Sequence, residues 1–167
     1  MREVYGDFWD YPADVKLITT NGFVKNNGEA VMGRGVAYQA TIKCPGVARH
    51  IGAIIAQYGN HTRLLAVQGI LSSPDFLQGI GFGIFPTKHH WREKSDINLI
   101  KQSAEELRDI ARSAPKKVFL LPAPGTSNGR LSYYDVRKVI AGILPDNVIV
   151  ISNDMEVAQY MEQVNAA

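Results

Sequence analysis

A lysine in the segment FPTKHHWREKSD (residues 85–96) stands where its amine could react. Lys88 comes two residues after Pro86, at the end of a strand-like apolar run. A lysine at the end of a buried strand loses part of its hydration, which lowers its pKa and frees a nucleophilic amine. Because Arg92 and Lys94 follow in the same segment, the alternative is a solvated basic turn.

A first glycine-rich segment, residues 19–41, lies between a strand-like run and a helix-like run. Its glycines are Gly22, Gly28, Gly33 and Gly35. Glycine lets a backbone approach a ligand closely, and the first amides of a helix can bind an anion. Neither familiar phosphate motif matches. Arg34 and Gly35 stand where a P-loop needs lysine and a hydroxyl, and Tyr38 replaces the third glycine of the dinucleotide fingerprint. An ordinary loop remains the alternative.

A second glycine-rich segment, PAPGTSNGRLS (residues 122–132), contains the G-x-S-x-G pattern of a serine hydrolase around Ser127. In that family of folds the histidine follows the serine, yet all four histidines of this chain precede Ser127. We therefore favour a turn whose amides, with the hydroxyls of Thr126 and Ser127, surround a phosphate. Two such loops facing each other would suit a diphosphate.

No metal site is predicted from the sequence. The adjacent His89 and His90 point in different directions, and Cys44 has no partner at metal-ligand spacing. A single cysteine also forms no internal disulfide, which is typical of a reducing compartment.

The elements that position these residues follow from hydrophobic patterning. Short apolar runs rich in β-branched residues predict strands, and amphipathic stretches predict helices between them. We therefore expect an α/β layered fold, with ligands beyond the carboxyl ends of the strands. The predicted strands are residues 15–20, 64–70, 79–87, 117–122 and 147–152, and the predicted helices are residues 46–57, 96–113 and 132–144, with another beginning near Gly35.

The bulk composition is that of an ordinary globular protein. The chain has 167 residues, a formal charge of +2 and 46% hydrophobic residues, which suits one domain with a sizeable core. The N-terminal residues lack the apolar region of a secretory signal peptide, and no apolar run is long enough to span a membrane. We expect a cytoplasmic protein with no membrane partner.

Taken together, the motifs resemble those of the macro domain family, which binds ADP-ribose. The resemblance rests on GDFW (6–9), VKLITTN (15–21), VMGRGVA (31–37) and PGTSNGRL (124–131). It implies a three-layer α/β/α fold, a mixed sheet with helices on both faces. It also implies a single domain over residues 1–167, with a core of about 3–152 and a C-terminal helix or tail at 153–167.

The resemblance also implies roles for individual residues. Asp7 would meet the adenine, Asn21 would lie beside the distal ribose, and the two glycine loops would hold the diphosphate from opposite sides. The implied ligand-binding residues are Asp7, Phe8, Asn21, Gly33, Gly35, Val36, Ala37, Gly125, Thr126, Ser127, Asn128, Gly129 and Arg130.

The FPTKHHW stretch is similar to that of the branch that removes ADP-ribose from thymidine in DNA. In that branch a lysine attacks the anomeric carbon of the distal ribose, and Lys88 stands at its place. The implied catalytic residues are Lys88 and Asn21, the latter orienting a ribose hydroxyl or water. The sequence departs from the pattern where a human relative uses an acidic residue, because Gly129 stands there and leaves proton transfer unassigned.

The predicted function is therefore binding of ADP-ribose and hydrolysis of ADP-ribosyl conjugates, without a cofactor. Two alternatives stay open: a non-catalytic reader or sponge for ADP-ribose, and a phosphatase acting on ADP-ribose 1″-phosphate. The expected partner is ADP-ribose or an ADP-ribosylated macromolecule. The candidate DNA-contacting residues are Lys88, His89, His90, Trp91 and Arg92.

Overall fold

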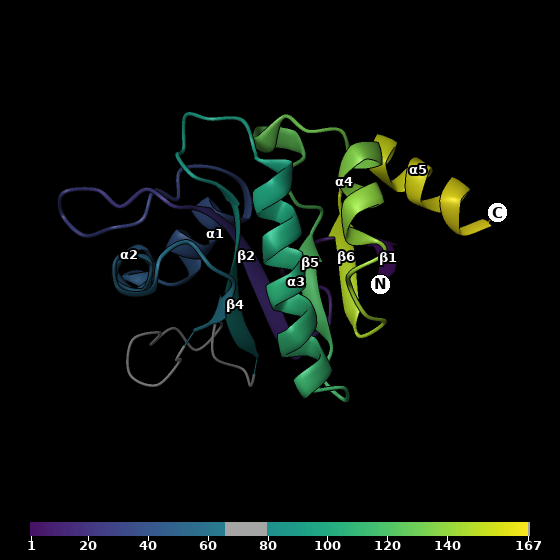
Figure 1. Cartoon of the computed structure of the whole chain (residues 1–167), viewed down its shortest axis with the longest axis horizontal. Helices are drawn as coiled ribbons and strands as arrows, with labels where there is room; N and C mark the ends of the chain where they lie inside the picture. The colour runs from purple at the N-terminus through teal and green to yellow at the C-terminus, as the bar shows by residue number, and fades with distance from the viewer. Residues whose placement is uncertain (66–79, 167) are drawn as a thin grey trace.

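The computed structural model describes residues 1–65 and 80–166, which form one sheet with helices on both of its sides (Figure 1). The elements in chain order are β1 Arg2–Tyr5, β2 Val15–Asn21, α1 Gly35–Lys43, α2 Val47–Tyr58, β3 Arg63–Leu64, β4 Gly81–Lys88, α3 Ile97–Ser113, β5 Phe119–Pro122, the short 3-10 helix η1 Ser127–Gly129, α4 Tyr133–Ile140, β6 Val148–Ser152 and α5 Met155–Ala166.

The six strands of the described residues are ordered β1-β6-β5-β2-β4-β3. All neighbouring pairs are parallel except β3 and β4, so the sheet is mixed. Since β2, β4, β5 and β6 run in the same direction, their carboxyl ends meet at one edge of the sheet. The register between β2 and β4 shifts after Thr20, and this irregularity places Asn21 beside Lys88.

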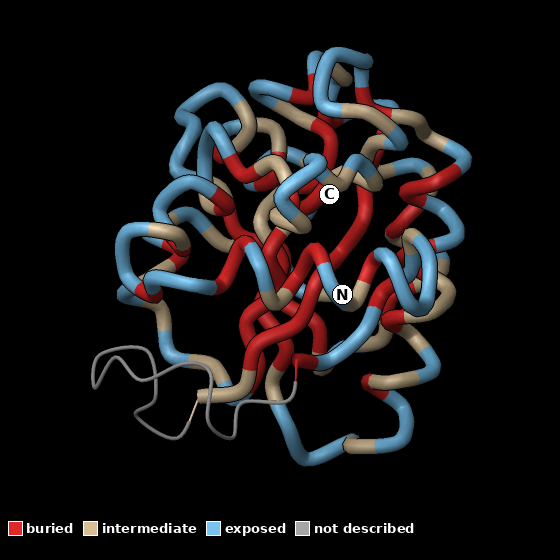
Figure 2. Tube along the Cα trace, turned by 90° about the vertical axis from the view of Figure 1, so that its left-hand side faces the viewer, coloured by how far each residue is buried: buried red, intermediate tan, exposed pale blue. Residues whose placement is uncertain are grey.

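Two layers of helices cover the sheet because successive strand residues point to opposite faces. Leu17 packs in the core beneath α3 and α4, to which α5 contributes Met161. Ile18 packs in the opposite core, beneath α1 and α2. Buried residues follow the strands while exposed residues lie on the outer turns (Figure 2). The expected α/β/α fold class is confirmed.

The central strands and the start of α3 lie close to their predicted positions. The predicted strands at 15–20, 79–87, 117–122 and 147–152 correspond to β2, β4, β5 and β6. Helix α3 begins after Asp96, whose carboxylate accepts hydrogen bonds from the amides of Asn98 and Leu99, at 2.8 and 3.4 Å.

The structure differs from the predicted elements in two places, and part of one predicted strand lies outside the described residues. The short edge strand β1 was not predicted, because Arg2–Tyr5 spans only four positions and begins with two charged residues, so it shows no alternation of polar and apolar residues. Helix α4 ends at Ile140 rather than at 144, since residues 141–143 form a turn and residue 144 a bend. Residues 66–70 of the predicted strand at 64–70 lie outside the described residues.

None of the helices in residues 1–65 and 80–166 combines the length and apolar character needed to cross a membrane.

Candidate active site

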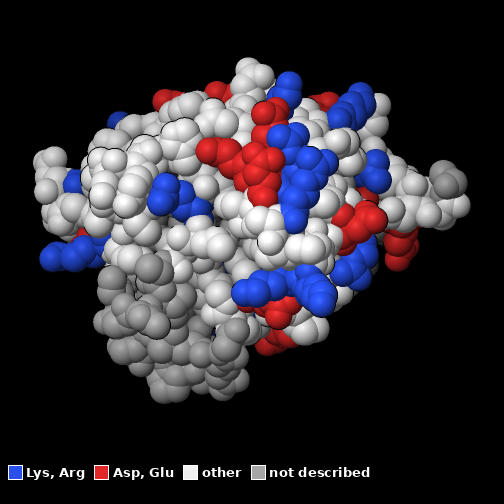
Figure 3. All heavy atoms as spheres, turned by 60° about the horizontal axis from the view of Figure 1, so that its bottom comes forward, with Lys and Arg blue, Asp and Glu red and all other residues white. Residues whose placement is uncertain are grey.

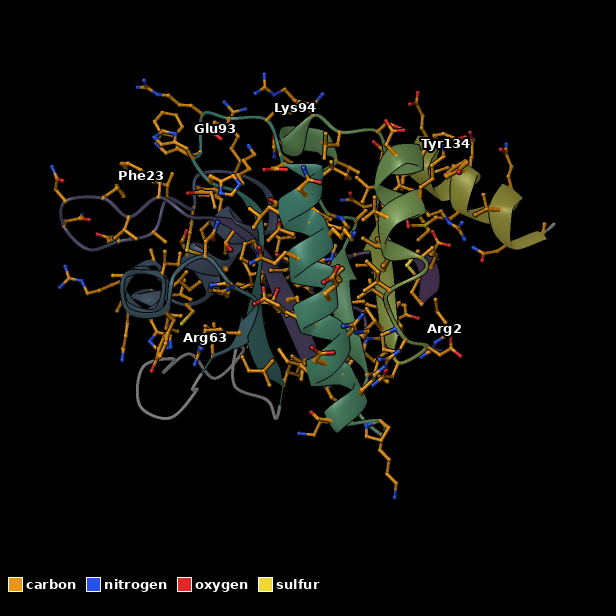
Figure 4. The ribbon with its side chains drawn as sticks, viewed as in Figure 1. Arg2, Phe23, Arg63, Glu93, Lys94 and Tyr134 are labelled. Atoms are coloured by element: carbon orange, nitrogen blue, oxygen red, sulfur yellow. The ribbon has the colours of Figure 1, made fainter. Side chains whose placement is uncertain are left out.

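A cleft of about 1550 Å³ opens at the edge where the strands end, as expected for this class of sheet. Its walls are the loops that follow β2, β4, β5 and β6. Figure 4 shows Phe23, Glu93 and Lys94 at this edge, and the first two line the cleft. The structure brings every predicted site residue to this one cleft: Asp7, Phe8, Asn21, Gly33, Gly35, Val36, Ala37, Lys88, Gly125, Thr126, Ser127, Asn128, Gly129 and Arg130.

The first glycine loop presents the amino end of α1 to the cleft. Gly35, the first residue of the helix, has a φ of 60°, a left-handed conformation that favours glycine. No side chain of the described residues caps this helix, and its first turn holds no acidic residue. The first amides of α1 therefore remain available, with the positive end of the helix dipole, for an anion.

The second glycine loop is a tight turn held by its own backbone. The amide of Leu131 donates to the carbonyl of Gly125, and the amide of Gly129 donates to that of Thr126. The Thr126 hydroxyl donates to the Ala123 carbonyl at 2.9 Å. Because that proton is engaged inside the loop, we expect amides rather than the Thr126 hydroxyl to meet an anion here.

The two glycine loops approach each other across the cleft. A Cβ atom added to Gly35 would lie 3.5 Å from the side-chain amide nitrogen of Asn128, in the second loop. This close approach matches the sequence prediction of two facing loops. A Cβ at position 35 would thus be in ordinary van der Waals contact with Asn128, and a longer side chain there would point into the space between the loops.

Lys88 ends β4 and reaches toward the second glycine loop. Its Nζ donates a hydrogen bond to the carbonyl of Asn128 at 3.3 Å. Partial burial, followed by the positive charges of Arg130 and Arg34, lowers the pKa of the Lys88 amine below its usual value. A larger fraction of this amine is therefore neutral, and nucleophilic, than for an exposed lysine at the same pH.

Asn21 fixes the start of the first glycine loop. Its side-chain Nδ2 donates to the Val31 carbonyl at 2.9 Å, and its Oδ1 accepts from the Phe23 amide at 3.0 Å. The adjacent Gly22 amide donates to the Lys88 carbonyl at 3.0 Å. The Asn21 side chain thus ties the two ends of the first glycine loop together, while the Gly22 amide holds the start of this loop against the end of β4.

Ser95 occupies the space that a side chain at position 129 would need. A Cβ atom added to Gly129 would lie within 2.3 Å of the Ser95 Oγ. This Oγ is buried and has no hydrogen-bond partner in the described part of the chain. An acidic residue therefore does not fit at position 129 without displacing Ser95. Nothing in the sequence pattern pointed to Ser95.

The buried ammonium group of Lys16 anchors the N-terminal segment that carries Asp7. Lys16 is only 2% exposed, and its Nζ donates to the carbonyls of Phe8 and Trp9 at 2.8 and 2.7 Å. Burial lowers its pKa, while the carboxylates of Asp10 and Asp7 oppose that change. The Asp7 carboxylate itself accepts from the Trp9 and Asp10 amides at 2.9 and 3.1 Å.

We expect Lys16→Met to lower the free energy of unfolding by about 1–3 kcal/mol, because two buried carbonyls lose their donor. Chemical denaturation measures this difference. Lys43→Met is the matched control, since Lys43 is an exposed lysine 5.2 Å from the Trp9 ring of the same segment. The control should stay within about 0.5 kcal/mol of wild type. Equal destabilisation by both variants would contradict an anchoring role for Lys16.

Residues 1–65 and 80–166 hold no group of three or more histidine, cysteine, aspartate or glutamate side chains arranged to bind a metal ion. Cys44 is buried in the core beneath α1 and α2, and burial raises the pKa of its thiol.

Charged side chains line the cleft with a positive excess. Among the described residues these are the basic Lys25, Arg34, Lys88, Arg92 and Arg130 and the acidic Asp7, Glu93 and Asp154. On the face turned forward in Figure 3, by contrast, acidic and basic side chains stand next to each other. The cleft is therefore suited to a ligand with several negative charges.

Comparisons with known proteins agree with this geometry. No protein-family model matches the chain. One curated relative, a DNA ADP-ribosyl glycohydrolase of Thermus aquaticus (strain ATCC BAA-2747 / Y51MC23), is 26% identical over 151 residues, which is 84% of this chain and 36% of that protein. The chain thus spans about a third of the length of the curated relative that it matches.

Several of the similar solved structures are macrodomains. The macrodomain of Mycobacterium tuberculosis DarG superposes with a TM-score of 0.68 and 21% identity, over 91% of this chain and 98% of that one. The macrodomain of Thermus aquaticus DarG gives 0.69 and 23%, over 92% and 97%. Thermosipho africanus DarTG in complex with ADP-ribose gives 0.70 and 20%, over 90% and 41%. The chain therefore has the macrodomain fold.

Proposed function

We propose that this protein binds ADP-ribose in the cleft and hydrolyses ADP-ribosyl conjugates, DNA-linked conjugates first, with Lys88 as the nucleophile. The observation that carries the proposal is the position of Lys88. Its amine has a lowered pKa and reaches toward the second of two facing loops whose amides suit an anion. The structure of Thermosipho africanus DarTG with ADP-ribose and the DNA ADP-ribosyl glycohydrolase relative support ADP-ribose as the ligand and DNA-linked ADP-ribose as the substrate, without bearing on the role of Lys88.

The geometry suggests how ADP-ribose would lie. The adenine would lie near Asp7, on the segment that Lys16 anchors. The diphosphate would lie between the amino end of α1 and the loop of residues 125–130, which face each other. The distal ribose would then lie beside Asn21 and Lys88, which are neighbours across β2 and β4.

In this arrangement the neutral amine of Lys88 attacks the anomeric carbon of the distal ribose. The bond between that carbon and Nζ forms while the bond to the departing group breaks, and the departing group leaves with the electron pair. Nζ loses a proton and the departing group gains one, so protons balance. Water then hydrolyses the covalent adduct, which releases ADP-ribose and regenerates the amine.

A direct test incubates the protein with ADP-ribosylated single-stranded DNA and with a protein carrying glutamate-linked ADP-ribose, and measures free ADP-ribose. The expected result is release from the DNA conjugate. ADP-ribose 1″-phosphate is a third substrate. Release of inorganic phosphate from it, with both conjugates left intact, would assign the protein to the phosphatase alternative and overturn the proposal.

A non-catalytic reader of ADP-ribose is the second candidate, and one observation favours it. Gly129 carries no acidic side chain to relay a proton, and Ser95 closes the space that such a side chain would need. If calorimetry detects ADP-ribose binding while no conjugate releases ADP-ribose, the protein is a reader.

A further inference from the structure

Three aromatic rings and a guanidinium group lie in consecutive contact along one wall of the cleft. The Phe23 and His90 rings are tilted by 59° with centroids 4.7 Å apart, and the His90 and Trp91 rings are stacked with centroids 5.5 Å apart at an interplanar angle of 26°. The Arg92 guanidinium lies 4.7 Å from the Trp91 centroid. We call these four residues the ring stack, and all of them line the cleft.

The ring stack exposes large apolar surfaces. Phe23 is 37% exposed and Trp91 is 42% exposed. Single exposed aromatic residues are common on proteins, but a contiguous exposed group beside a cleft indicates a binding surface. The guanidinium adds a positive charge, so the surface combines flat rings with a cation. This combination is the one by which proteins bind unpaired nucleobases and their phosphates.

The stack is held in place from several directions. Phe23 follows Asn21, whose side chain accepts from the Phe23 amide. The His90 Nδ1 accepts from the Arg92 amide at 3.1 Å, which fixes the His90 ring. Asn60 donates to the Lys88 carbonyl at 3.0 Å and so braces the end of β4, where the stack begins. A rigid platform costs little ordering entropy when a base binds.

His89 belongs to a different contact, although the sequence placed it among the candidate DNA-contacting residues. Its Nε2 lies 2.9 Å from the carboxylate of Asp96, the residue that caps α3. Its neighbour His90 instead contacts Phe23 and Trp91. In the segment after Lys88, His89 therefore contacts the residue that caps α3, whereas His90, Trp91 and Arg92 belong to the ring stack.

The position of the stack relative to Lys88 indicates what it would contact. If the anomeric carbon lies at Lys88, the departing group extends away from the diphosphate, toward the mouth of the cleft. His90, Trp91 and Arg92 follow Lys88 directly in the chain, and Phe23 joins them from the loop after β2. We therefore expect the ring stack to contact the macromolecule that carries ADP-ribose.

We infer that the ring stack of Phe23, His90, Trp91 and Arg92 binds a nucleobase that flanks the modified one on an unpaired DNA strand. This inference rests on the proposed function. In a duplex both faces of each base are covered by its neighbours, so only an unpaired strand offers a base face to the stack. The stack would thus make the protein select single-stranded DNA over duplex DNA and over modified protein.

The test compares two substrates that differ only in their flanking nucleotides. One is a short single-stranded oligonucleotide with one ADP-ribosylated base, and the other is the same ADP-ribosylated nucleoside alone. We expect Phe23→Ala and Trp91→Ala to lower kcat/KM for the oligonucleotide by about 5–150-fold, the range for loss of one base–aromatic stack. Both variants should keep the wild-type kcat/KM for the nucleoside and the wild-type affinity for ADP-ribose.

Tyr134→Ala is the matched control. Tyr134 is 49% exposed and has the Lys138 ammonium 3.9 Å from its ring centroid, so it is also an exposed ring beside a cation. It lies on α4, on the side of the molecule away from Phe23 (Figure 4). The control should leave kcat/KM for both substrates unchanged.

The outcomes separate this inference from the proposed function. Equal losses on both substrates, or no loss on the oligonucleotide, would overturn the inference while leaving hydrolysis intact. If the wild-type protein hydrolyses no conjugate, the proposed hydrolysis fails. Fluorescence anisotropy of the ADP-ribosylated oligonucleotide then decides the inference: weaker binding by Trp91→Ala than by Tyr134→Ala supports it, and equal binding overturns it.

Discussion

Lys88→Ala is expected to bind ADP-ribose about as tightly as the wild-type protein and to release it from conjugates at least about 100-fold more slowly. The diphosphate would be held mainly by loop amides, which the substitution leaves in place. The covalent step, by contrast, loses its attacking amine, because alanine offers no nucleophile at the end of β4. Calorimetry measures the binding, and single-turnover release of ADP-ribose measures the chemistry.

Lys88→Arg is the matched control for charge. A guanidinium keeps the positive charge but stays protonated at any working pH, so it cannot act as a nucleophile. We expect it to be as slow as Lys88→Ala. If either variant turned over at the wild-type rate, Lys88 would have no part in the chemistry.

The pH dependence of hydrolysis should also depend on the protonation state of the Lys88 amine. The rate should rise with pH as Lys88 loses its proton and should level off above its pKa, which lies below the usual value for lysine. The Arg130 charge contributes to that lowering, after partial burial. Arg130→Gln should therefore move the midpoint of the rise to higher pH, while Arg112→Gln, a change in the last turn of α3, should not move it.

Local patterns were sufficient to predict the parts of the site that follow directly from strand ends. Lys88 was identifiable because an apolar run precedes it, and Gly35 because a helical pattern begins there. The parallel order of the strands then brings these local features to one edge. The fold class follows from the same alternation of strands and helices.

The residues that sequence reasoning missed depend on contacts between distant segments. Lys16 interrupts an apolar run, and a single charge in such a run gives no sign that its ammonium group binds the carbonyls of Phe8 and Trp9. Phe23 joins the ring stack only because β2 pairs with β4. The packing of Ser95 against Gly129 likewise becomes apparent only once the second glycine loop is folded over the start of α3.

Gly35→Glu is expected to lower the affinity for ADP-ribose by at least about 100-fold. The position lies at the amino end of α1, where a Cβ would already be in van der Waals contact, at 3.5 Å, with the side-chain amide nitrogen of Asn128 in the facing loop. A glutamate side chain there would fill the space proposed for the diphosphate. It would also place a negative charge beside two others, at a cost of about 1–4 kcal/mol for each pair at 4 Å. Isothermal titration calorimetry measures the loss.

Gly35→Ala separates obstruction from backbone strain. Since φ at position 35 is 60°, any other residue there is strained by about 1–2 kcal/mol, and alanine adds this strain without charge or reach. We expect Gly35→Ala to be less stable than wild type but to bind ADP-ribose within a few-fold of it. Gly142→Glu controls for the added charge, because a Cβ at that position would point into open space, with no heavy atom of the described residues beyond its own chain neighbours within 4 Å. If Gly35→Glu bound ADP-ribose as tightly as Gly142→Glu, the diphosphate would not lie between the two loops. The placement of the distal ribose beside Lys88 would then lose its support, because that placement follows from the position of the diphosphate.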